Sequence, residues 1–127
     1  MQDYESLELV YDVVRDLIQA LEQVWSEGCL DENGIEVLSG CYSVCDYIAN
    51  RLASLNREQD EIEEPRLIKA THYLASLDVL KQCESALARD LSDEICTSFI
   101  DYKKVNALVG FRKLISHIKE LTGIIND

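Results

Sequence analysis

The 127-residue sequence contains little that would break a helix, because it has one proline and five glycines. So few turn residues disfavour a β-sandwich or a β-barrel, which need many tight turns. The hydrophobic content of 47% is too high for an intrinsically disordered chain. We therefore expect residues 1–127 to form a single all-α domain, large enough to bury a core without disulfides or a bound metal.

The sequence also lacks long apolar runs and a basic N-terminal segment. No apolar stretch approaches the ~18 residues of a membrane span, and the start, MQDYESLELV, carries acids where a secretory signal would carry bases. The five cysteines are an odd number without a Cys-x-x-Cys or other metal-ligand spacing, which argues against a disulfide framework and a zinc site. We expect a cytoplasmic protein without metal, cofactor or membrane association. Cys41 and Cys45 should pack as small hydrophobes, and Cys29 should be the most exposed thiol.

Apolar residues recur at alternating spacings of three and four, which is typical of amphipathic helices. The pattern predicts a four-helix bundle built from two antiparallel hairpins. In the first helix the apolar face is wider than a two-stranded seam, so this helix should contact more than one neighbour. Surplus apolar surface on the first and last helices also predicts a homodimer. The four helices are expected near residues 4–27, 34–57, 65–91 and 93–122.

Short capping patterns set the expected helix ends. Gly28 is placed to end the first helix, and Asn33 with Glu36 resembles a capping box that opens the second. The only proline, Pro65, suits the first turn of the third helix, and Ser92, followed by two acids, reads as the N-cap of the fourth.

Basic residues are scarce in the first half of the chain, and the two halves therefore differ strongly in net charge. Residues 1–64 hold 16 acidic and 3 basic residues, a net charge of −13, whereas residues 65–127 hold 8 acidic and 9 basic residues, a net charge of +1. The first two helices, in residues 1–64, are called the acidic hairpin, and the last two, in residues 65–127, the near-neutral hairpin. The acidic hairpin should repel free DNA and RNA, and its charge favours a basic protein partner. Ordinary solubility is the alternative explanation of the same charge. The acids expected to contact a partner are Asp3, Glu5, Glu8, Asp12, Asp16, Glu58, Asp60, Glu61, Glu63 and Glu64.

One short motif points to a different class of protein. In VGFRKLISH, residues 109–117, four residues separate Arg112 from His117. This motif resembles the active site of the HEPN superfamily of small helical nucleases and toxins, and the segment GCYSVCDYIANRL, residues 40–52, loosely matches its HepT-like branch. The resemblance implies a metal-independent endoribonuclease, active as a homodimer, in which Arg112 would bind the scissile phosphate and His117 would transfer a proton.

Arg66 and His72 fit a loosened version of the same spacing, so the motif alone does not single out one histidine. A helix that is regular around Gly110 would place Arg112 and His117 140° apart, because five residues turn through 500°. Two hypotheses therefore remain from the sequence. The first is a non-enzymatic interaction protein of the inhibitor, antitoxin or anti-defence type, which binds a basic or nucleic-acid-handling partner protein. The second is the HEPN-like metal-independent endoribonuclease or a degenerate relative of it, and RNA binding is expected only under this second hypothesis.

Overall fold

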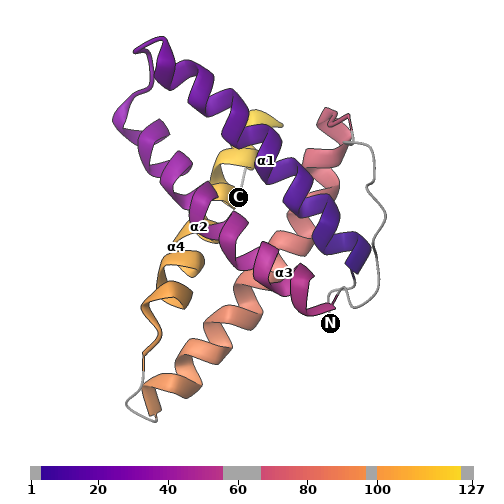
Figure 1. Ribbon diagram of the computed structural model, residues 1–127, viewed down its shortest axis with the longest axis vertical. Helices are drawn as coiled ribbons and strands as arrows, with labels where there is room; N and C mark the ends of the chain where they lie inside the picture. The colour runs from indigo at the N-terminus through magenta and orange to yellow at the C-terminus, as the bar shows by residue number, and fades with distance from the viewer. Residues whose placement is uncertain (1–3, 56–66, 97–99, 124–127) are drawn as a thin grey trace.

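The computed structural model describes residues 4–55, 67–96 and 100–123. They form four helices, α1 (Tyr4–Ser26), α2 (Glu32–Leu55), α3 (Ala70–Cys96) and α4 (Tyr102–Leu121), and these ranges contain no strand (Figure 1). The short connection between α1 and α2 makes these helices antiparallel neighbours (Figure 1). The predicted all-α four-helix bundle is confirmed.

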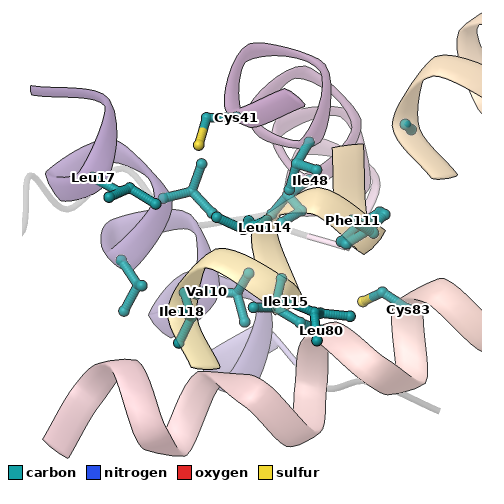
Figure 2. Packing of buried hydrophobic residues seen from close by; sticks show 14 of the residues in the cluster. Val10, Leu17, Cys41, Ile48, Leu80, Cys83, Phe111, Leu114, Ile115 and Ile118 are labelled. Carbon is teal, nitrogen blue, oxygen red and sulfur yellow. The ribbon is translucent and has the colours of Figure 1, made fainter. Parts of the chain in front are cut away.

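The helices are arranged so that each one contacts two others. α1 packs against α2 and α3, and α4 packs against the same two helices. The prediction that the first helix contacts more than one neighbour is therefore confirmed. In the centre, Leu114, Ile115 and Ile118 of α4 lie among side chains of the other helices (Figure 2). The buried core consists of Leu7, Val10, Val13, Val14, Leu17, Leu21, Val37, Leu38, Cys41, Val44, Ile48, Leu77, Leu80, Cys83, Leu87, Leu91, Ala107, Phe111, Leu114, Ile115 and Ile118.

The C-terminal end of α1 agrees with the sequence pattern. Gly28 has a φ of +74°, a conformation that glycine adopts without steric cost. Its N–H donates to the carbonyl of Trp25 at 2.9 Å, and the N–H of Cys29 donates to the carbonyl of Val24 at 3.1 Å. These two hydrogen bonds form a Schellman motif, which confirms Gly28 as the residue that ends the helix.

The predicted start of the second helix was wrong by two residues. α2 begins at Glu32, and the Asp31 side chain accepts a hydrogen bond from the N–H of Gly34 at 2.7 Å. Asp31 is therefore the capping residue, in place of Asn33. Both side chains are preferred at this position, so the choice between them depends on the path of the connection.

The boundaries of α3 and α4 also differ from the prediction. Residues 67–69 are not helical and α3 begins at Ala70, so a start at Pro65 is wrong. α3 then continues through Ser92 to Cys96, and the cap of α4 is Asp101, whose Oδ1 accepts from the N–H of Lys103 at 2.9 Å. The acids after Ser92 do not open a helix, because they lie within the last turns of α3, and Glu94 accepts a hydrogen bond from Lys104 of α4 at 2.5 Å.

α2 and α4 meet at two glycines. A Cβ atom built on Gly110 would lie 2.6 Å from the carbonyl oxygen of Gly40, and one built on Gly40 would lie 3.1 Å from the Cα of Gly110. The backbones can approach this closely because neither residue has a side chain. α4 is continuous through Gly110, so this glycine permits a helix contact and does not break the helix.

Candidate functional site

Four of the ten acids predicted to contact a partner lie in the described part of the chain. Glu5, Glu8, Asp12 and Asp16 follow one another at helical spacing along α1, outside its buried stripe, and Asp16 lies at the edge that faces α3. Glu5 is exposed and the other three are half-buried. The remaining six, Asp3, Glu58, Asp60, Glu61, Glu63 and Glu64, lie outside the described residues.

Asp16 already has a partner within the chain. Its carboxylate accepts a hydrogen bond from the hydroxyl of Tyr73 at 2.7 Å, which links α1 to α3. Burial, followed by this hydrogen bond, raises the pKa of Tyr73, so the phenol stays protonated and continues to donate. Asp16 therefore contributes to the packing of the bundle, and a partner would have to compete for its carboxylate.

The acidic hairpin carries further exposed acids that the sequence prediction did not include. They are Glu22 and Glu27 on the α1 side and Asp31, Glu32, Glu36 and Asp46 on the α2 side. Lys113 of α4 reaches Glu36 at 2.8 Å, so a base of the near-neutral hairpin neutralises one acid of the other hairpin. Lys104 and Arg112 instead pair with acids of their own hairpin, Glu94 and Glu84.

An apolar groove opens on the outer face of the same hairpin. It has a volume of about 540 Å³ and is lined by Glu22 and Trp25 of α1 and by Ile35, Leu38, Ser39 and Tyr42 of α2. Trp25 is 55% exposed, Ile35 41% and Tyr42 49%, and these three exposed apolar side chains line one concave surface. The hydroxyl of Tyr42 donates a hydrogen bond to the Glu22 carboxylate across the groove, and this interaction raises the pKa of Tyr42.

Sequence reasoning missed this groove. Trp25 counted as part of the wide apolar face of the first helix, and Ile35 and Tyr42 lie off the stripe that predicted the second. The signal that could have found the groove is the spacing of Ile35 and Tyr42, which lie seven residues apart and therefore on one side of a helix.

Arg112 and His117 contact different neighbours in the bundle. The Nε of Arg112 donates to the carboxylate of Glu84 on α3 at 2.9 Å. His117 instead lines a small polar pocket of about 90 Å³ with Lys113 and Ser116 of α4, Glu120, and Asn33 and Val37 near the start of α2. Within one chain the two side chains therefore lie on different sides of α4.

The His117 ring is partly enclosed. Its Nδ1 atom is buried and has no hydrogen-bond partner among the residues described by the structure. Burial lowers the pKa of His117, and the nearby Glu120 carboxylate opposes part of this effect. At neutral pH the ring is accordingly uncharged, and this is the form that accepts a proton.

The second histidine has a local structural contact. The Nδ1 of His72 accepts a hydrogen bond from the N–H of Lys69 at 2.9 Å, as the third helical residue does in a capping box. His72 thus stabilises the start of α3, while Arg66 lies outside the described residues.

The structure describes the side chains of four cysteines, and two of them are fully buried. Cys41 is buried and Cys45 half-buried against the core, whereas Cys29 is exposed, as expected from the sequence. Burial raises the pKa of Cys41 to about 12 and that of Cys83 to about 11, so these thiols stay protonated. Over residues 4–55, 67–96 and 100–123, no three His, Cys, Asp or Glu side chains gather as a metal site would require.

Together these features define a four-helix bundle with an acidic hairpin and an apolar groove on it. No protein-family model, no curated protein and no solved structure matches the chain. None of the helices in the described ranges combines the length and the apolar character needed to cross a membrane.

Proposed function

We propose that the protein is a non-enzymatic interaction protein whose acidic hairpin, α1 with α2, binds a basic partner protein. The observation that carries this proposal is the separation of charge along the sequence, a net −13 over residues 1–64 and +1 over residues 65–127. Residues 4–55, which contain α1 and α2, hold 10 acidic and 2 basic residues, a net charge of −8. Charge of one sign on one surface speeds the encounter with a partner of opposite sign and disfavours other partners. An inhibitor, an antitoxin or an anti-defence protein would act in this way on a partner that itself handles nucleic acid.

The distribution of exposed acids supports the proposal. Glu27 at the end of α1 and Asp46 on α2 are exposed, as is Glu32 in the first turn of α2. Lys113 neutralises Glu36 from the other hairpin, but Lys104 and Arg112 are directed to acids of their own hairpin. Asp46 shares a pocket with Arg51, Lys103 and Lys104, so the negative charge offered to a partner is concentrated around Glu22, Glu27, Asp31 and Glu32.

The alternative is that the charge serves solubility alone, and salt separates the two explanations. Protein captured from a native lysate on the immobilised chain should dissociate steeply as ionic strength rises, because charges at a surface are screened within ~10 Å at ~0.1 M salt. Capture that is insensitive to salt contradicts the proposal.

A pair of matched variants tests which surface binds. Glu27→Lys with Glu32→Lys changes two exposed acids of the acidic hairpin, and Asp78→Lys with Asp93→Lys changes two exposed acids of α3. Both variants have the same net charge. The first should release the captured partner at lower salt than the second; equal elution would show that net charge, and not the acidic hairpin, retains the partner.

RNA cleavage through Arg112 and His117 is a second proposal, favoured by the polar pocket in which the uncharged His117 lies beside Lys113 and Ser116. Because Arg112 pairs with Glu84 on the other side of α4, a complete site would require a second chain. Arg112→Ala and His117→Ala should each abolish cleavage of a single-stranded RNA and preserve the helical content. Cleavage that survives both substitutions rules out this role.

A further inference from the structure

The groove on the acidic hairpin, lined by Glu22, Trp25, Ile35, Leu38, Ser39 and Tyr42, contains apolar side chains that the core does not use. Leu38 forms part of the buried core, whereas Trp25, Ile35 and Tyr42 remain about half exposed. Exposed aromatic and aliphatic side chains around a concave surface are typical of binding sites for another chain. From Ile35 to Tyr42 the groove follows α2 for about 10 Å, or two helical turns.

One acidic side chain lines this groove, and two more lie on α2 beyond the residues that line it. Glu22 lines it and accepts the hydrogen bond of Tyr42. On α2, Glu32 precedes Ile35 by three residues and Asp46 follows Tyr42 by four, so both exposed acids continue the same side of the helix. Asp46 also lines a neighbouring pocket with Arg51, Lys103 and Lys104, so Glu22 and Glu32 are the acids nearest to the groove that do not share a pocket with these bases. An occupant must therefore offer apolar side chains in the middle and positive charge around them.

The negative charges in and near the groove determine which kind of chain can bind there. A second copy of this chain, docked on the groove about a two-fold axis, would bring Glu22 and Glu32 close to the same acids of its partner, and such like-charge contacts are unfavourable. A basic amphipathic helix has the required pattern, because its apolar residues lie on one side and its lysines or arginines lie beside them.

We propose that this groove binds an amphipathic helical segment of the basic partner. The apolar side chains of that segment would contact Trp25, Ile35 and Tyr42, and its basic side chains would pair with Glu22 and Glu32. This inference rests on the proposed function and adds to it the part of the hairpin that anchors the partner.

Trp25 is the only tryptophan of the chain, so its fluorescence reports on the groove directly. The probe is a labelled, tryptophan-free helical peptide composed of leucine and lysine with all leucines on one side. A peptide of the same composition in shuffled order, without an apolar side, is the control. The amphipathic peptide should shift the Trp25 emission to shorter wavelength, protect it from acrylamide quenching and bind about tenfold more tightly than the shuffled peptide.

Substitutions to aspartate give opposite expectations for the groove and for charge alone. Ile35→Asp adds a negative charge, so a purely electrostatic contact would bind the basic peptide as tightly as before or more tightly. Binding in the groove predicts about tenfold weaker binding, because an apolar contact is lost. Val109→Asp is the matched control, since Val109 of α4 is similarly exposed and the added charge is the same. Tyr42→Asp provides a second groove variant if Ile35→Asp does not fold.

The possible failures are distinguishable. If the amphipathic peptide binds but leaves the Trp25 emission unchanged, or if both groove variants bind it as well as Val109→Asp does, the groove is not the anchor and the acidic-surface function survives. If neither peptide binds at low salt, the proposed function fails together with the groove. If the Trp25 emission shifts with protein concentration alone and the mass doubles, a second copy occupies the groove and the inference is overturned.

Discussion

The two sides of α2 differ in how completely they are covered. On the side of α4, Gly40 and Gly110 bring the two backbones together, and the rings of Tyr47 and Phe111 pack edge to face with centroids 5.7 Å apart. On the side that forms the groove with α1, Trp25 and Tyr42 remain about half exposed. The apolar residues of one helix can therefore serve two purposes; Leu38 belongs to the core and also lines the groove, whereas Ile35 and Tyr42 line the groove without being buried in the core.

The largest difference in stability is expected when one aromatic side chain is truncated on each of these two sides of α2. Phe111 is completely buried and Trp25 is 55% exposed. Phe111→Ala should lower the free energy of unfolding by about 3–5 kcal/mol, because it removes buried apolar contacts and leaves a cavity. Trp25→Ala should cost less than about 1 kcal/mol, as is usual for changes of exposed side chains.

Urea unfolding followed by far-ultraviolet circular dichroism measures both variants on the same scale. A loss of stability in Trp25→Ala as large as that in Phe111→Ala would mean that the groove is part of the core of the folded protein in solution. The comparison between a covered and an open side of α2 would then be wrong.

The glycine contact between α2 and α4 gives the next largest effect. Gly110→Ala should lower the free energy of unfolding by up to about 2 kcal/mol, which is the overpacking cost of about 1–3 kcal/mol reduced by the gain in helix propensity. The new Cβ would lie 2.6 Å from the carbonyl oxygen of Gly40, which belongs to the backbone and cannot rotate away. The gain in helix propensity, by which alanine favours a helix over glycine, is roughly 1 kcal/mol.

Gly40→Ala is the matched variant for the same contact. Its Cβ would lie 3.1 Å from the Cα of Gly110, so a smaller shift of the backbone relieves the contact. We expect a smaller loss of stability than for Gly110→Ala in the same urea titration. A larger loss of stability for Gly40→Ala than for Gly110→Ala would show that these two contact distances do not determine the cost of adding a methyl group at the α2–α4 contact.

The features predictable from the sequence were those that repeat along the chain. The three-four spacing of residues such as Leu7, Val10 and Val14 predicted α1 and its buried side, because each turn repeats the same information. Single capping residues were less informative, since Ser92 and Asp101 are both suitable N-caps, and in the structure α3 continues through Ser92 while Asp101 caps α4.

The candidate site was predictable in charge but not in shape. Counting acids and bases along the sequence is enough to find the acidic hairpin. The contact of Asp16 with Tyr73 joins residues 57 positions apart, so it depends on how α1 and α3 pack. Likewise, the groove exists because no helix of the described chain covers Trp25 and Tyr42, and the spacing of residues within one helix does not contain that information.

A pH dependence should arise from His117, in the pocket between α2 and α4. Burial lowers its pKa in the folded protein below the ordinary value of 6.5. The unfolded chain therefore binds the proton more tightly, so the contribution of His117 to stability is complete above about pH 6.5 and is lost as the pH falls through the folded-state pKa. Between about pH 7.5 and about pH 5.5, the wild-type protein should lose more stability than His117→Gln does.

Carboxylates contribute little to the change in stability over this pH range, because ordinary aspartate and glutamate side chains titrate near pH 4. Chemical denaturation at both pH values, with the two proteins in the same buffers, gives the difference directly. Parallel pH profiles for wild type and His117→Gln would show that the ring is as accessible to water in the folded protein as in the unfolded chain.

The smallest effect is expected at the rim of the α2–α4 contact, where Lys113 pairs with Glu36 at 2.8 Å. Both side chains remain partly exposed, and ion pairs of this kind contribute about 0–1 kcal/mol. In a double-mutant cycle with Lys113→Gln and Glu36→Gln, the coupling energy should stay below about 1 kcal/mol and decrease with added salt. A larger coupling that salt does not change would mean that charge pairing, and not the packing of Gly40, Gly110 and Phe111, closes this side of α2.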